Sequence, residues 1–300
     1  MRRKGGINLE LFAEPVLPVG AELGEGPVWH EAALWFVDIE GKRLHRFDPA
    51  SGEHDHWDAG QRIGVAAPAS DGRWAVGLED CLGLWNPATG ELERLCAPEP
   101  DRPRNRFNDG KCDPRGRLFA GTMSMDAEPG QGALYRIGPT GDYAVIARNA
   151  TISNGLAWNA ALETMYYIDS PTRRVDAFQW DSETGDVSDR RPVFEFDENE
   201  GVVPDGMCID AEGRLWVALW GGGAVVCVDP GECAIVDRVR VATDHTTSCC
   251  FGGPDLADLY ITTARRGLSA DALARQPAAG AVFRARPGVQ GLPVDVFRLG

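Results

Sequence analysis

Four oxygen-bearing side chains recur at one position of a repeated pattern and could together bind a cation. Glu25, Asn108, Asn154 and Asp205 stand beside Gly or Asp in LGEGPVW, RFNDGKCD, ISNGLAW and VPDGMCID. Two carboxylates and two amides that met without a basic partner would repel and be poorly solvated, and a divalent cation would relieve both costs. Oxygen ligands suit hard cations. Each residue alone is typical of a turn, and only their common position favours a metal site.

That common position is defined by six aromatic residues, each of which follows a polar turn and lies in a strand-like run. They are spaced 39, 45, 47, 50 and 44 residues apart: Trp35, Trp74, Phe119, Tyr166, Trp216 and Tyr260. The four candidate ligands lie about ten to twelve residues before an aromatic, within a repeat of about 40–50 residues that is typical of propeller blades. Inner ends of blades meet at a central channel. The sequence therefore predicts an all-β, six-bladed β-propeller with a metal site in the central channel.

Turn signals and strand patterns continue through the whole chain. Alternating patterns predict strands at 44–48, 133–137, 175–180 and 281–285, and a Ser cap followed by a later Pro predicts one short helix at 269–275. No low-complexity linker interrupts the repeats, so we expect a single domain over residues 1–300. The strand-like segments 7–11 and 294–299 lie outside the repeats, and pairing of strands from the two ends in one blade would close the ring.

Composition limits the classes of partner. The net charge of −15 argues against nucleic acid and anionic membranes. Eight cysteines without C-x-x-C spacing fit a reducing compartment. The basic start has no apolar region behind it, and no stretch approaches the length of a membrane span. We therefore expect a cytoplasmic protein that acts on a small molecule, with no nucleic-acid, membrane or obligate protein partner.

Six long segments in collinear order carry a recognisable pattern: LGEGPVW, NRFNDGKCDPRGRLFAGTM, ISNGLAW, PDGMCIDAEGRLWVA, TTSCCFGGPDLADLYITTAR and RQPAAGAVF. Together they resemble the regucalcin/gluconolactonase family, also called the senescence-marker-protein family, from about residue 20 to about residue 290. LWGGGAVV and TTARRGLS are at least as similar to bacterial pentono- and hexonolactonases. The resemblance implies a six-bladed propeller, one divalent metal in the channel, and hydrolysis of sugar lactones to aldonic acids.

The resemblance also implies roles for individual residues. The implied metal ligands are Glu25, Asn154 and Asp205. The implied substrate-binding residues are Arg106, Asn108 and Asp126. Animal members of the family carry Glu where this chain has Asp126, and segment 124–132 is shorter than their lid loop. Both differences bear on the choice of substrate and leave the metal ligands unchanged.

These assignments predict a metal-dependent aldonolactonase of a sugar oxidation pathway, a hydrolase acting on carboxylic esters. The cation, which could be Ca²⁺, Zn²⁺, Mn²⁺, Mg²⁺ or Fe²⁺, would act as a Lewis acid, and Asp205 would accept the proton of the attacking water. Two alternatives remain open: a phosphotriesterase-like hydrolase on the same propeller, and a non-catalytic calcium-binding regulatory protein. Arg106 at the mouth favours a catalyst, because a protein that only bound metal would gain nothing from an arginine there.

Overall fold

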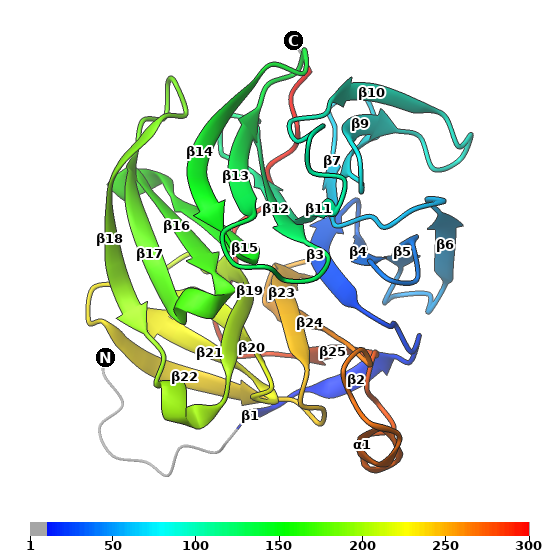
Figure 1. Cartoon of the computed structure of the whole chain (residues 1–300). Coiled ribbons are helices and arrows are strands. Elements are labelled where there is room, and N and C mark those ends of the chain that lie inside the picture. Colours follow the sequence, from blue (N-terminus) through cyan, green and yellow to red (C-terminus); the bar gives the residue numbers. More distant parts are fainter. Residues whose placement is uncertain (1–10, 300) are drawn as a thin grey trace.

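Six sheets arranged around a common centre form the protein between residues 11 and 299, which this computed structural model describes (Figure 1). The first two blades, from the innermost strand outward, are β3 (Gly24–His30), β4 (Ala33–Asp38), β5 (Arg43–Phe47) and β6 (His54–Asp58), then β7 (Val65–Pro68), β8 (Trp74–Gly77), β9 (Leu82–Trp85) and β10 (Leu92–Cys96). The next two are β11 (Asn105–Cys112), β12 (Leu118–Ser124), β13 (Gly132–Ile137) and β14 (Tyr143–Ala150), then β15 (Ser153–Asn159), β16 (Thr164–Asp169), β17 (Arg174–Trp180) and β18 (Val187–Glu195). The last two are β19 (Val203–Ile209), β20 (Leu215–Trp220), β21 (Ala224–Asp229) and β22 (Ala234–Arg240), then β23 (Thr246–Gly252), β24 (Asp258–Thr263), β25 (Val282–Ala285) and β2 (Glu14–Leu17).

This architecture confirms the predicted all-β, six-bladed β-propeller. All six marker aromatics lie on the second strand of a blade, and all four candidate ligands lie on innermost strands. The four strands predicted from alternation correspond to β5, β13, β17 and β25. Three short 3₁₀ turns, Ala160–Leu162, Ser170–Thr172 and Glu198–Glu200, and one helix, α1 (Ala270–Arg275), complete the described elements. The helix begins as predicted, because the Ser269 hydroxyl accepts a hydrogen bond from the Ala272 N–H at 3.2 Å.

An N-terminal and a C-terminal strand pair to close the ring, but the last segment of the chain does not form the expected strand. β2 pairs antiparallel with β25 in the sixth blade, while β1 (Leu11–Phe12) pairs in parallel with β22 of the fifth. An N-terminal strand therefore closes the ring, although most of the expected segment 7–11 lies outside the described residues. The expected strand at 294–299 is wrong. This segment crosses one end of the channel, where Phe297 is fully buried and its N–H donates to Pro68 O at 2.8 Å.

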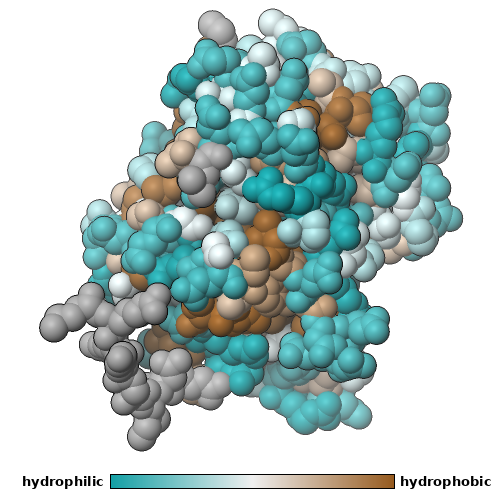
Figure 2. All heavy atoms as spheres, turned by 90° about the vertical axis from the view of Figure 1, so that its left-hand side faces the viewer, coloured by the Kyte–Doolittle hydropathy of each residue, from teal (hydrophilic) through white to brown (hydrophobic). Residues whose placement is uncertain are grey.

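The core lies between neighbouring blades, so the inner strands are buried on both faces. Every residue of β12 and β16 is buried, whereas the outermost strands β6, β10 and β18 expose alternate or consecutive residues. Figure 2 shows one side of the ring, where hydrophilic residues cover most of the face and a smaller apolar area lies near the middle. None of the helices within residues 11–299 is both long enough and apolar enough to cross a membrane.

Buried aspartates hold two of the glycine-containing turns between strands. Asp210 Oδ1 accepts from the backbone N–H groups of Glu212 and Arg214, each at 2.9 Å. Its Oδ2 accepts from Arg214 Nε at 2.9 Å and from Trp216 Nε1 at 3.0 Å. Asp113, in the turn 113–117, makes the equivalent contacts to two backbone N–H groups and an arginine. One carboxylate therefore satisfies four donors and fixes the path from the inner strand to the second.

Replacing Asp210 by Ala should lower the free energy of unfolding by about 1–3 kcal/mol, because buried donors would lose their acceptor. Urea denaturation monitored by tryptophan fluorescence would measure the loss. Glu212→Ala is the matched control: Glu212 contacts the same arginine at 3.1 Å but is 65% exposed, so its removal should cost below about 1 kcal/mol. Equal losses for the two variants would contradict the importance assigned to the buried carboxylate.

Candidate active site

β-Bulges interrupt four innermost strands where the candidate ligands stand. Pairing with the second strand of the blade shifts register between Glu25 and Val28, Phe107 and Asp109, Ser153 and Leu156, and Pro204 and Met207. A bulge inserts an extra residue, bends the strand locally and re-aims side chains. The bulges therefore explain how largely buried strands can present polar side chains to the channel at equivalent places.

Glycines beside the candidate ligands allow the innermost strands to approach one another closely. A Cβ at Gly155 would lie 2.8 Å from Asp205 O, and a Cβ at Gly206 would lie 2.1 Å from Ser248 Oγ. Neither position can hold a side chain without displacing its neighbour. These close contacts also show that equivalent positions of successive blades lie side by side, so Asn154 and Asp205 meet at one level of the channel.

The carbonyl oxygen of Asn154 is left free for a ligand. Its Nδ2 donates to Ser170 Oγ at 2.9 Å, and its side chain also hydrogen-bonds Asp205. These contacts fix the orientation of the amide. Asn154 Oδ1 is buried and has no hydrogen-bond partner among residues 11–299. An unpaired buried acceptor costs about 1–3 kcal/mol, and a cation or a donor bound there would remove that cost.

Three buried carboxyls lie close enough to influence one another. Burial raises the pKa of Glu25 well above its usual value, and the charges of Asp205 and Asp109 raise it further. Burial and Asp109 likewise raise the pKa of Asp205 well above its usual value, and the Arg106 guanidinium opposes both shifts. Lys111 opposes the raised pKa of Asp109, so two cationic side chains face three carboxyls. The geometry therefore favours bound positive charge or bound protons.

Arg106 and Asn108 form a buried pair beside these carboxyls. Arg106 Nη1 donates to Asn108 Oδ1 at 2.8 Å and to Phe107 O at 2.9 Å, and Asn108 Nδ2 donates to Ser153 O at 2.9 Å. Burial lowers the pKa of Arg106 to about 10, with the Arg266 charge adding to the shift. The guanidinium remains cationic near neutral pH. Asn108 is held by Ser153 of the neighbouring blade, and Arg106 is held by Phe107 and Asn108 of its own strand.

Asp126 lies at the rim, apart from the buried residues. It follows β12, its side chain is 52% exposed, and its carboxylate accepts from Arg104 Nε at 3.0 Å and Nη2 at 2.6 Å. The adjacent Met125 contacts Arg62, whose charge acts on Arg106, so this loop lies on the Arg106 side of the channel. Contact between Asp126 and a substrate stays a prediction, and it requires a sugar hydroxyl to share or replace the Arg104 contact.

Asp109 is a buried carboxylate that was not among the predicted site residues. Regular strand alternation would place the residue after Asn108 on the opposite face, but the bulge between Phe107 and Asp109 breaks that alternation. Asp109 Oδ1 accepts from the Gly110 N–H at 2.7 Å, and burial raises its pKa. The signal in the sequence is the pair Asn-Asp before Gly, but a bulge cannot be located from those letters alone.

The residues present fit a hard cation with oxygen ligands. Glu25 and Asp205 supply carboxylates, and Asn154 supplies the unpaired amide oxygen described above. Over residues 11–299, no cluster of three or more His, Cys, Asp or Glu side chains is arranged to hold a metal ion. A cation here would therefore depend on the amide oxygen and on water as well as on the carboxylates, which is the donor set preferred by Ca²⁺ and Mg²⁺.

Comparison with known proteins gives similarity along nearly the whole chain. Regucalcin of Oryctolagus cuniculus is 43% identical over 296 residues, covering 93% of this chain and 96% of that protein. A solved regucalcin from Agrobacterium tumefaciens, described as a calcium-binding protein, superposes with a TM-score of 0.91 at 30% identity and covers 97% and 99% of the two chains. A solved luciferin-regenerating enzyme gives a TM-score of 0.89 at 34% identity over 96% and 99%.

A family model agrees with these relatives and with the resemblance noted in the sequence. This family model is described as the SMP-30/Gluconolactonase/LRE-like region, and it matches residues 23–265 of the chain. That range includes every candidate ligand, the Arg106–Asn108 pair and Asp126. The chain belongs to the SMP-30/gluconolactonase/LRE-like family.

Proposed function

We propose that the protein is a metal-dependent sugar lactonase, which hydrolyses aldonolactones to aldonic acids in a sugar oxidation pathway. The observation that carries the proposal is the buried group of Glu25, Asp205 and the unpaired Asn154 oxygen beside the fixed Arg106–Asn108 pair. The family description, which names gluconolactonase, supports the same class of reaction. A divalent cation held by Glu25, Asn154 and Asp205 would supply a Lewis acid for the lactone carbonyl.

Asp205 is the proposed proton acceptor. A water oxygen attacks the carbonyl carbon and one water proton passes to an Asp205 oxygen. The bond from that carbon to the ring oxygen then breaks, and the ring oxygen takes the proton back from Asp205 to become a hydroxyl. In the metal-free protein, burial and Asp109 raise the pKa of Asp205. A bound cation would hold the carboxylate ionised and therefore able to accept a proton. The product carboxylic acid ionises, so each turnover releases one proton.

Arg106 and Asn108 would orient the sugar. Their mutual hydrogen bond and the bond from Asn108 to Ser153 O leave one Asn108 N–H and one Oδ1 lone pair for substrate hydroxyls. Arg106 donates only, whereas Asn108 both donates and accepts. Asp126, at the rim, would accept a hydrogen bond from a more distant hydroxyl, and we expect this contact to affect the choice between five-carbon and six-carbon lactones.

The proposal predicts metal-dependent acid release from sugar lactones. A pH-stat assay of glucono-, xylono-, arabinono- and galactonolactones should show turnover with added divalent metal and none without it. Asp126→Glu should change the ratio of kcat/KM between five- and six-carbon lactones, whereas Glu128→Asp, a change of the same size in the same loop, should leave the ratio unchanged. Failure to hydrolyse any of these lactones in the metal-loaded state would contradict the proposed function.

A second candidate is a calcium-binding protein without catalysis, because the solved Agrobacterium regucalcin is described only as calcium-binding. The same carboxylates and amide oxygen would serve that role. Calcium binding alone gives no reason for the buried Arg106 that is hydrogen-bonded to Asn108. Calcium binding that persists in a protein inactive on every lactone would favour this second candidate.

A further inference from the structure

A cavity lies in the channel at the end opposite to the candidate active site. Its volume is about 370 Å³, and residues of all six innermost strands line it together with the C-terminal segment 292–295. On β11 the cavity begins at Gly110, two residues beyond Asn108, and on β19 it begins at Cys208, three residues beyond Asp205. Strands rise about 3.3 Å per residue, so the two sites are separated by roughly 7–10 Å along each strand.

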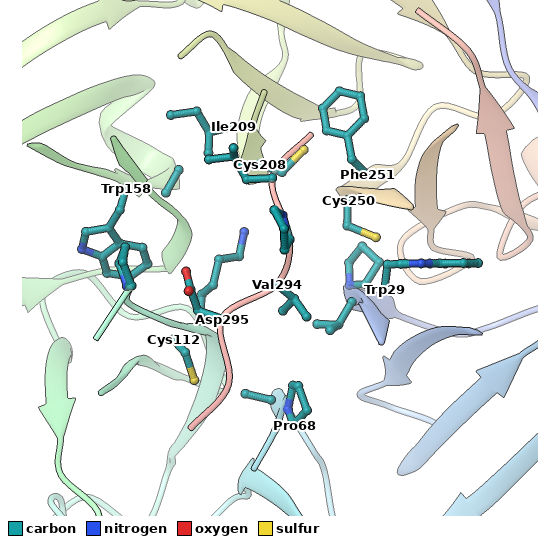
Figure 3. Close-up of a pocket in the computed structure, with 18 of the residues that line it drawn as sticks. Trp29, Pro68, Cys112, Trp158, Cys208, Ile209, Cys250, Phe251, Val294 and Asp295 are labelled. Atoms are coloured by element: carbon teal, nitrogen blue, oxygen red, sulfur yellow. The ribbon is translucent and has the colours of Figure 1, made fainter. Parts of the chain in front are cut away.

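Rigid apolar side chains form most of the cavity wall. Trp29 and Trp158 lie on opposite sides of it, with Phe251 and Ile209 between them and Val294 on the chain segment that crosses it (Figure 3). The Trp29 ring stacks on Tyr260 at 5.5 Å, and the Trp158 ring packs edge-on against Phe119 at 5.1 Å. A ring-sized apolar body would be held between walls that do not need to rearrange, and cavities of this volume are typical of small-molecule sites.

Two side chains of opposite charge give the cavity its polarity. Lys111 donates from Nζ to Met207 O at 2.8 Å, and its charge opposes the raised pKa values of Asp109 and Asp295, with neither of which it forms a hydrogen bond among residues 11–299. An ammonium has three donors, so two remain for a ligand. Asp295 lies on the crossing segment, with its side chain on the Trp158 side of the cavity (Figure 3). Burial and Asp113 raise the pKa of Asp295 to about 6, against the charges of Arg298 and Lys111, so the Asp295 carboxylate is protonated more easily than an exposed one.

We propose that this cavity is a second ligand site, which binds a small monocarboxylate with a ring-sized apolar body, the carboxylate lying on Lys111 and the body between Trp29 and Trp158. The segment 292–296 provides the route of entry. It is tied at both sides, by the Gly291 N–H to Leu256 O and the Phe297 N–H to Pro68 O, each at 2.8 Å. Within the described chain, residues 292–296 make no backbone hydrogen bond, so this part can move aside without breaking any.

Three matched probes test the site by isothermal titration calorimetry on the whole protein: 3-phenylpropionate, its neutral amide and 3-phenylpropylamine. The carboxylate should bind about tenfold or more tightly than the amide, because a charge-assisted hydrogen bond to Lys111 is lost in the amide. The amine should bind most weakly. Val294→Trp, which fills the cavity from the crossing segment, should abolish binding of all three.

Two variants with opposite expected effects identify the groups responsible. Lys111→Met keeps the length and apolar stem of the side chain and should weaken 3-phenylpropionate by about tenfold or more while leaving the amide nearly unchanged. Asp295→Asn removes a like charge and should tighten the carboxylate. If Lys111→Met does not fold, Asp295→Asn still decides the matter, since unchanged or weaker carboxylate binding would overturn the proposal. Equal binding of the three probes, or no binding of any, would overturn it as well.

Discussion

Replacing Asp205 by Asn should reduce lactone turnover by about 10²–10⁴, the range typical of a lost general base. The substitution keeps an oxygen of nearly the same shape but removes the negative charge and the basic site. Asn154 and Arg106 both stabilise the Asp205 carboxylate. The oxygen of the substituted Asn side chain can still accept a hydrogen bond from them. Metal affinity should fall more modestly, so kcat measured at saturating metal should remain low. Steady-state kinetics over a range of metal concentration would separate the two effects.

Asn154→Ala is the matched control for that experiment. It removes the unpaired Oδ1 and the hydrogen bonds to Ser170 and Asp205, but no base. Its activity should therefore recover largely when metal is added in excess. If Asp205→Asn also regained the turnover of the unmodified protein at high metal, Asp205 would act only as a ligand, and the proton would have to pass to another group.

Removal of the divalent metal should abolish lactone hydrolysis, and one equivalent of metal should restore it. The reason is the local charge: Glu25, Asp205 and Asp109 are buried together, with Arg106 opposing the raised pKa values of the first two and Lys111 that of the third, so two positive charges face three carboxyls and a divalent cation would relieve the remaining repulsion. Chelator-treated protein, verified by elemental analysis, would be assayed before and after titration with each candidate metal. Full activity in metal-free protein would contradict the account.

Metal binding should also depend on pH, and this dependence can be measured without an activity assay. Protons compete with metal for the Glu25 and Asp205 carboxylates, whose pKa values lie well above the usual range. In metal-free protein these raised values favour the folded state at low pH, and that contribution is lost as pH rises through them. Metal affinity should therefore increase with pH and binding should release protons. Metal at about 100 times its Kd stabilises the folded protein by about 2.7 kcal/mol, and the stabilisation increases as Kd falls. At a constant metal concentration, the metal-induced rise in Tm should therefore grow with pH.

The fold was predictable because the signals for it are periodic. Six aromatics mark the second strands, and the turns between them contain Gly at places where the backbone requires a positive φ, such as Gly213 at 82°. Apolar runs such as LFAGTM are typical of strands buried on both faces. The ends of the chain were not predictable in the same way. VDVFRL alternates like a strand, but its apolar residues cover one end of the channel, and alternation alone does not distinguish these uses.

The candidate ligands were identifiable from the sequence because their position in the repeat is shared. Glu25, Asn154 and Asp205 stand on innermost strands, and electrostatic coupling and hydrogen bonding connect Asp205 with the other two. Asp109 was missed because a bulge reverses its expected direction. The ion pair of Asp126 with Arg104 also could not be foreseen, since it joins residues 22 positions apart across a loop whose path the sequence does not specify. Long-range side-chain contacts of this kind require coordinates.

The central claim is that one divalent cation occupies the channel between Glu25, Asn154 and Asp205. Anomalous X-ray diffraction from crystals loaded with Mn²⁺, measured at the manganese edge, tests it most directly. The account predicts a single strong peak within coordination distance of the two carboxylates and of Asn154 Oδ1, and its loss in Glu25→Gln crystals treated in the same way. A peak elsewhere in the propeller, or no peak in the channel of active protein, would contradict the claim.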